Sequence, residues 1–198
     1  MKVQPFLSSG QTIALFGGSF DPPHAGHRLV AEAALSTLGV DYIWWMVSPQ
    51  NPLKTNAANE LKARLSATRD LAKHAQFHVD AIEAELGTQY AIDTVRALKA
   101  RHPDVRFIWL LGADNLSQMH QWKDWQSLMR EIPVAVYPRG NDLRAALEAP
   151  AAMAFLEAQL PSDAASQLKT KAAPAWVLLE GELSPLSSTA LRNRQAGN

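Results

Sequence analysis

The chain has 198 residues, 47% of them hydrophobic and 19% charged, and its 19 Lys and Arg balance 19 Asp and Glu, so the formal net charge is zero. This length suits one domain with a hydrophobic core, and the balanced charge argues against a nucleic-acid partner, which would favour a basic excess. The absence of cysteine excludes disulfides, thiolate metal sites and a cysteine nucleophile. No segment has the pattern of a signal peptide or a membrane span, so we expect a cytoplasmic protein without a membrane partner.

The first informative stretch is an apolar strand that runs into two glycines. Residues Thr12 to Phe16 form a short apolar run that predicts a buried strand, and Gly17 and Gly18 follow directly. Glycine has no Cβ, so the backbone can bend sharply there and its N–H groups can approach a ligand closely.

Two histidines stand at the expected start of the next helix. His24 and His27 are three residues apart, so they share one face of the first turn if the helix begins near Pro23. Imidazole N–H groups and the positive end of a helix dipole both favour a phosphate. The glycines match neither the dinucleotide fingerprint nor a Walker loop. The stretch therefore predicts a phosphate site of another kind; the structural alternative is a glycine turn with two surface histidines.

The following residues predict a β-α-β unit. Helical spacing of apolar residues ends at Gly39, and Asp41 to Val47 has the aromatic and branched residues of a second strand. Such a unit pairs its strands in parallel with a right-handed crossover. The turn-rich loop Ser48 to Lys54 then lies at the carboxyl edge, where parallel sheets bind ligands, and Lys54 can reach a phosphate there.

The middle of the chain alternates helices and short strands. Asn59 can cap a second helix, and Phe77 to Asp80 predicts a third strand. We expect Glu83 and Glu85, which follow it, to lie on a solvated surface and not to form a catalytic pair.

Two further segments are predicted to reach the ligand edge. Thr88 can cap a helix that carries Tyr90 in its first turn, and a helix N-terminus suits a carboxylate. The apolar run Val105 to Leu111 predicts a central strand and is followed by Asp114. That carboxylate can accept ribose hydroxyls or hold Mg²⁺ through water, or it can simply cap the next helix.

The tryptophans after this strand have two interpretations. Trp122 and Trp125 fall on one helical face, so core packing explains one of them and stacking on a flat heterocycle the other. Further strands are predicted over Pro133 to Tyr137 and Ala175 to Leu179. Between them we expect Ala-rich helix over residues 141–160 and a polar connector over 161–174.

The last informative stretch combines hydroxyls with an arginine. Ser188 or Thr189 can cap a helix, and Arg192, one turn along, can bind phosphate with both arms of its guanidinium. Alone, this pattern indicates only a capped helix.

Motifs at the two ends of the chain carry a family resemblance. Gly17-Gly18-Ser19-Phe20-Asp21-Pro22 with His24-Ala25-Gly26-His27 resembles the signature of the nucleotidyltransferase superfamily with a His-x-Gly-His motif. Ser187-Ser188-Thr189-Ala190-Leu191-Arg192 resembles that superfamily's Ser-Ser-Thr-x-x-Arg. Within the superfamily the chain is most similar to the bacterial nicotinate-nucleotide adenylyltransferases. The resemblance implies an α/β fold with a doubly wound, Rossmann-like parallel sheet in a single domain, 1–198, whose part from about 184 onward carries the triphosphate motif.

The resemblance also implies the reaction and its residues. A 5′-phosphate oxygen of nicotinate mononucleotide attacks the α-phosphorus of ATP, giving nicotinate adenine dinucleotide and pyrophosphate in NAD biosynthesis. Because that phosphate is already ionised, catalysis rests on alignment and charge stabilisation. His24 and His27 are the implied catalytic residues, and Mg²⁺ enters on the ATP phosphates and not on protein ligands. The residues implied to bind ATP are Gly17, Gly18, Ser19, His24, His27, Asp114, Ser188, Thr189 and Arg192. Those implied to bind the mononucleotide are Gly18, Ser19, Phe20, Lys54, Thr88, Tyr90 and Trp122.

Alternatives remain beside this interpretation. The acceptor can be nicotinamide mononucleotide, phosphopantetheine or another phosphorylated compound, and a regulator that binds nucleotide without turnover belongs to a different functional class. A homo-oligomer is compatible with the sequence.

Overall fold

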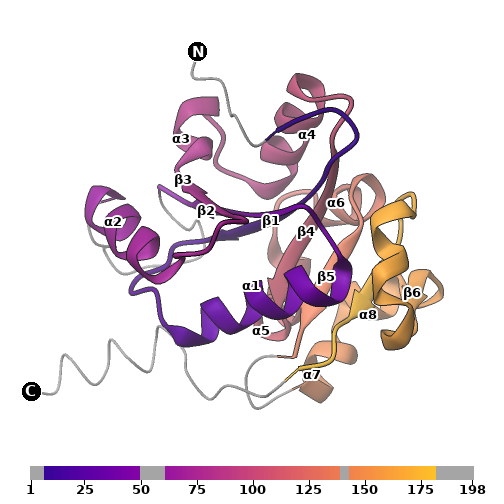
Figure 1. Ribbon diagram of the computed structural model, residues 1–198. Helices are drawn as coiled ribbons and strands as arrows, with labels where there is room; N and C mark the ends of the chain where they lie inside the picture. Colours follow the sequence, from indigo (N-terminus) through magenta and orange to yellow (C-terminus); the bar gives the residue numbers. More distant parts are fainter. Residues whose placement is uncertain (1–6, 50–60, 139–142, 182–198) are drawn as a thin grey trace, which may run out of the picture.

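The centre of the fold is a parallel sheet. The computed structural model describes residues 7–49, 61–138 and 143–181. Within them, seven strands pair in parallel in the order β3-β2-β1-β4-β5-β7-β6 (Figure 1). The strands are β1 Thr12–Gly18, β2 Tyr42–Val47, β3 Phe77–Asp80, β4 Arg106–Gly112, β5 Val134–Tyr137, β6 Gln159–Leu160 and β7 Trp176–Leu178.

Helices cover both faces of this sheet. The α-helices are α1 Ala25–Leu38, α2 Leu61–Leu71, α3 Ile82–Leu86, α4 Ala91–Arg101, α5 Ala113–Gln118, α6 Trp125–Glu131, α7 Leu143–Leu147 and α8 Pro150–Ala154. Short 3₁₀ segments are η1 Met119–Gln121, η2 Leu156–Ala158 and η3 Ser162–Thr170. Helices α1 and α4 lie on opposite sides of the sheet (Figure 1). The predicted doubly wound α/β fold is confirmed.

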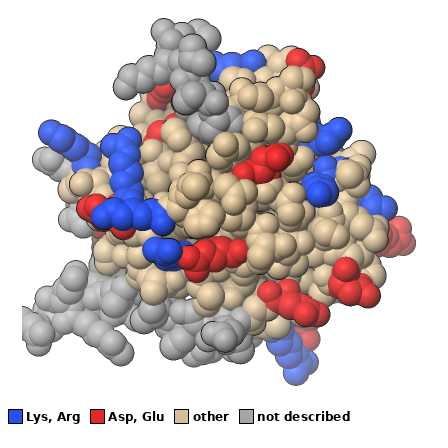
Figure 2. All heavy atoms as spheres, in the orientation of Figure 1, with Lys and Arg blue, Asp and Glu red and all other residues tan. Residues whose placement is uncertain are grey.

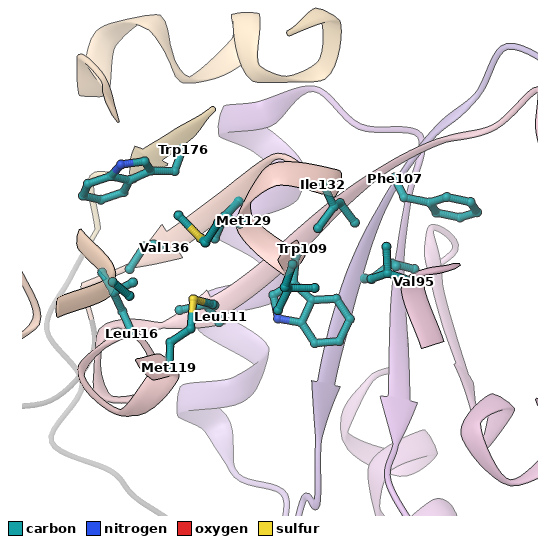
Figure 3. Packing of buried hydrophobic residues seen from close by; sticks show 14 of the residues in the cluster. Val95, Phe107, Trp109, Leu111, Leu116, Met119, Met129, Ile132, Val136 and Trp176 are labelled. Carbon is teal, nitrogen blue, oxygen red and sulfur yellow. The ribbon is translucent and has the colours of Figure 1, made fainter. Parts of the chain in front are cut away.

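Alternation along the strands divides the core into two layers. Successive strand residues point to opposite faces, so Trp44 packs in the layer with α4 and Trp45 in the layer with α1, although both are fully buried. Figure 3 shows the first layer, where Trp109 and Leu111 of β4 lie near Met119 and Met129. Burial on both faces is why the strands are apolar throughout.

The site is positioned by the reversal of strand order at β1. The chain adds β2 and β3 on one side of β1 and β4 on the other. The segments that leave the carboxyl ends of β1 and β4 therefore diverge, which is where open α/β sheets bind ligands. Gly18 ends β1 and Gly112 ends β4, so both border this crevice.

Several predicted boundaries were wrong, for identifiable reasons. Gly17 and Gly18 belong to β1, where they are opposite Met46 and Val47 of β2, so the turn begins only at Ser19. The predicted strands are present, but the sequence did not reveal β6, whose two residues are too few for a periodic pattern. The expected connector over 161–174 contains η3. The predicted cap Asn59 lies outside the described residues.

The described surface has a mixed character. On the face shown in Figure 2, basic and acidic side chains are interspersed, and its described part has no extended basic area. Over the described ranges, no helix combines the length and the apolar character that a bilayer crossing requires.

Candidate active site

The loop after β1 places a buried aromatic ring beneath the glycines. Phe20 has φ +45°, an unusual value for a residue with a side chain, and its ring is only 2% exposed. A Cβ on Gly18 would lie 3.2 Å from the Phe20 ring, so a residue larger than glycine would disturb this packing. The ring makes edge contacts with Phe16 and His27 at 5.4 and 5.0 Å between centroids. Phe20, predicted to bind the mononucleotide, therefore has its side chain in the core, and contact with a ligand would come from its backbone.

The two histidines lie together at the start of α1. His24 is the N-cap residue and His27 is in the first turn, with ring centroids 3.8 Å apart, as the spacing predicted. They are 6% and 7% exposed, so they are not the surface histidines of the structural alternative. The His24 backbone N–H donates to His27 Nδ1 at 3.2 Å. This hydrogen bond assigns the proton of a neutral His27 ring to Nε2, which leaves Nε2–H as a donor.

An arginine that the sequence analysis missed joins two carboxyl-edge loops. Arg64 of α2 is 2% exposed, and its guanidinium donates to the carbonyl oxygens of Ser19 (2.7 Å), Ser48 (2.8 Å) and Pro49 (2.9 Å). Burial lowers the Arg64 pKa from its ordinary value, and the negative charge of Asp21 opposes that change. Ser19 and Ser48 follow β1 and β2, so Arg64 ties the two strand ends together. Its signal in the sequence was an arginine at an inward position of an apolar helical face.

A buried carboxyl near the same edge corrects another expectation. Glu83 was predicted to be solvated, but it is 6% exposed, because α3 turns Ile82 and Glu83 inward. Burial raises its pKa, and hydrogen bonds with the Ser48 and Thr94 side chains lower it in part. The expectation holds for Glu85, which is exposed and pairs with Arg101 at 3.2 Å.

The start of α4 differs from the prediction by two residues. Tyr90, not Thr88, is the N-cap residue, and its side chain makes no capping hydrogen bond. The Thr88 hydroxyl instead bonds to the Thr94 hydroxyl at 2.8 Å, which draws it towards the interior. Lys123 Nζ lies 4.7 Å from the centre of the half-buried Tyr90 ring and 2.9 Å from Asp93 Oδ2.

Asp114 and Trp122 lie in the segments that follow β4. Gly112 is the N-cap residue of α5 and no side chain caps that helix, so Asp114 is not a cap; it is exposed in the first turn. Trp122 and Trp125 do not share a helical face, because Trp122 lies in the turn before α6. Trp122 is half-buried with its ring edge-on to Trp109, at 6.5 Å between centroids, and Trp125 contacts Phe155 in the same way at 6.2 Å.

Four of the predicted site residues, Lys54, Ser188, Thr189 and Arg192, lie outside the described residues. The structure brings Gly17, Gly18, Ser19, His24 and His27 together at the end of β1. Among residues 7–49, 61–138 and 143–181, no three His, Asp or Glu side chains are grouped to hold a metal ion.

Comparison with known families identifies the group to which this chain belongs. The model of the cytidylyltransferase-like family matches residues 15–194. The chain belongs to the cytidylyltransferase-like family.

Relatives of this cytidylyltransferase-like chain carry a specific name. The chain is 48% identical to the probable nicotinate-nucleotide adenylyltransferase of Caulobacter sp., over 92% of this chain and 97% of that protein. It is 44% identical to the protein of the same name from Ruegeria pomeroyi, over 95% and 88%. These similarities confirm the resemblance expected from the motifs.

Solved structures support the cytidylyltransferase-like fold. The Plasmodium falciparum nicotinic acid mononucleotide adenylyltransferase complexed with NaAD matches 92% of this chain, and the match covers 83% of that chain, with a TM-score of 0.67. Its sequence is 18% identical, so the likeness concerns the fold.

Proposed function

We propose that this chain transfers the adenylyl group of ATP to nicotinate mononucleotide and so forms nicotinate adenine dinucleotide and pyrophosphate in NAD biosynthesis. The observation that carries the proposal is the buried pair His24 and His27 at the start of α1, beside the carboxyl end of β1. A match to relatives of this name over more than nine-tenths of the chain supports the choice of substrates.

The proposed reaction is a direct displacement at phosphorus. A 5′-phosphate oxygen of the mononucleotide forms a bond to the α-phosphorus of ATP, while the bond from that phosphorus to the bridging oxygen breaks and pyrophosphate leaves. The attacking oxygen is already ionised near neutral pH, so the step needs no general base. The protein contributes by holding the two substrates in line and by stabilising the negative charge.

His27 is suited to the stabilising role by its fixed tautomer. With Nδ1 accepting the His24 N–H, the neutral ring presents Nε2–H as a donor that requires no reorientation during the reaction. The free N–H groups and dipole of α1, which has 14 residues, add positive potential at the same end. In this proposal His27 contacts the α-phosphate and His24 a neighbouring phosphate.

The remaining contacts are proposed from their positions. Gly17, Gly18 and Ser19 present backbone to both nucleotides, and the exposed Asp114 faces the ribose of ATP. Tyr90 and Thr88 mark the acceptor side, where Trp122 stacks on the pyridine ring. Lys54 is assigned to the acceptor phosphate, and the group Ser188, Thr189 and Arg192 to the leaving phosphates, by resemblance alone.

Mg²⁺ is proposed to arrive with the triphosphate. Mg²⁺ commonly keeps several waters and binds through substrate phosphates and one or two carboxylates. The described residues fit such an ion, since they lack a grouped set of ligands but place one exposed carboxylate, Asp114, after β4. When bound, the ion would neutralise phosphate charge, and Asp114 would contact it through water.

Pyrophosphate release tests the proposal directly. Purified protein with ATP and Mg²⁺ is offered nicotinate mononucleotide, nicotinamide mononucleotide and phosphopantetheine in parallel. We expect release with the first at a kcat/KM at least about tenfold above the second. A preference for either of the others would assign a different acceptor, and no release from folded protein that binds ATP would favour a nucleotide-binding regulator.

A further inference from the structure

Glu83 is a buried acid for which the proposed reaction has no use. It lies on α3, in the connection between β3 and α4, and it is almost fully enclosed. Burying a carboxylate is costly unless hydrogen bonds compensate, and an apolar side chain of similar size is often at least as stabilising. Its hydrogen-bond partners therefore indicate what the buried carboxyl does.

Those partners belong to two different carboxyl-edge segments. The Glu83 carboxyl is hydrogen-bonded to the side chain of Ser48, which follows β2, and to the Thr94 hydroxyl of α4, at 3.4 Å. Thr94 bonds in turn to the Thr88 hydroxyl at 2.8 Å and to the Tyr90 carbonyl at 3.2 Å. The Glu83 carbonyl also accepts the Thr88 N–H at 3.0 Å. Glu83 thus connects the end of β2 with the residues that precede α4.

Ser48 continues the connection to the loop after β1. Its backbone N–H donates to the Gly18 carbonyl at 2.9 Å, and its own carbonyl accepts from Arg64 at 2.8 Å. The same Arg64 nitrogen donates to the Ser19 carbonyl. A continuous series of hydrogen bonds therefore leads from Gly18 through Ser48 and Glu83 to Thr88.

We propose that Glu83 is a positioning residue that, through Ser48 and Thr94, sets the loop of Gly18 and Ser19 in a fixed relation to the start of α4. This inference rests on the proposed function, in which the first segment faces the reacting phosphates and the second the acceptor. Glu83 touches neither histidine in this role. Its effect is on the alignment of one substrate with the other, for which small displacements cost about 100-fold in rate.

The variant Glu83→Ala tests the inference, with Glu85→Ala as the matched control on the same helix. We expect Glu83→Ala to lower kcat about 30- to 100-fold while the KM for ATP changes less than about threefold, because the separate sites persist and their alignment is lost. Glu83→Gln, which can still bond to both hydroxyls, should recover most of the loss. Glu85→Ala should match the wild type.

A second measurement does not depend on turnover. Amide hydrogen exchange of Ser48, whose N–H donates to Gly18, should become at least about tenfold faster in Glu83→Ala and stay unchanged in Glu85→Ala. Ser48→Ala removes the same link from the other side and keeps the test open if Glu83→Ala does not fold. In the double variant, the rate losses of Ser48→Ala and Glu83→Gln should be less than multiplicative.

The outcomes separate this inference from the proposed function. Wild-type protein that releases no pyrophosphate with nicotinate mononucleotide would refute the function, and hydrogen exchange would then decide the positioning role alone. Active wild-type protein together with unchanged kcat in Glu83→Ala and in Ser48→Ala would overturn the inference. So would a rise in the KM for ATP that accounts for the whole loss of kcat/KM.

Discussion

Replacing Arg64 by methionine should destabilise the protein strongly although it removes no apolar packing of comparable size. The three carbonyl oxygens of Ser19, Ser48 and Pro49 would lose a charged donor. At about 1.5 kcal/mol for each such hydrogen bond, the loss amounts to about 4.5 kcal/mol. Breaking a buried charge interaction with Asp21 costs about 3–5 kcal/mol, which overlaps with that figure and is not additional to it. We expect the free energy of unfolding to fall by about 3–5 kcal/mol.

Urea unfolding followed by circular dichroism measures this loss. At a typical slope of about 2 kcal/mol per molar urea, the midpoint should fall by about 1.5–2.5 M with the slope unchanged. Arg69→Met on the same helix is the control, because Arg69 is exposed and its contact with the Val79 carbonyl is long, at 3.4 Å. Arg64→Lys keeps the charge without the planar fork and should fall between the two. A midpoint for Arg64→Met within about 0.3 M of the control would refute the assignment of Arg64 as the link between the strand ends.

Three further predictions concern the site. His27→Asn keeps an acceptor for the His24 N–H but has no donor at the Nε2 position, so kcat should fall about 100- to 1,000-fold with little change in circular dichroism; near-normal turnover would remove His27 from the reaction. Trp122→Ala should raise the KM for the mononucleotide by more than that for ATP, and equal changes in both, measured by pyrophosphate release, would make Trp122 structural. The raised pKa of Glu83 means that the folded state holds this proton more tightly than the unfolded state, so its contribution to stability is lost as pH rises from about 4.3 through the raised pKa. Glu83→Gln lacks this titration, so the free energy of unfolding of the wild type relative to the variant should decrease with rising pH, and a constant or increasing difference would contradict the assigned burial.

Local patterns explain what could be predicted. The strand that ends in Gly17 and Gly18, and the spacing that places His24 and His27 on one turn, depend on residues within one short segment, so their geometry follows from backbone preferences. The parallel sheet followed from apolar runs alternating with helical spacing. Boundaries were less accurate: the α4 N-cap is Tyr90 and not Thr88, because the Thr88 hydroxyl bonds to the Thr94 hydroxyl instead of capping the helix.

The sequence by itself determined the fold class, the family and the histidine pair, because each depends on contiguous residues whose conformations are set by local sterics and by periodic burial. Only the tertiary structure decided the partners of Arg64 and Glu83. Arg64 is 45 residues from Ser19 along the chain, and its role depends on β2 lying beside β1. Glu83 has the composition of a surface residue, and only the packing of α3 against the end of β2 encloses it. Strand order brings such distant polar groups together, and no local pattern records which ones will meet.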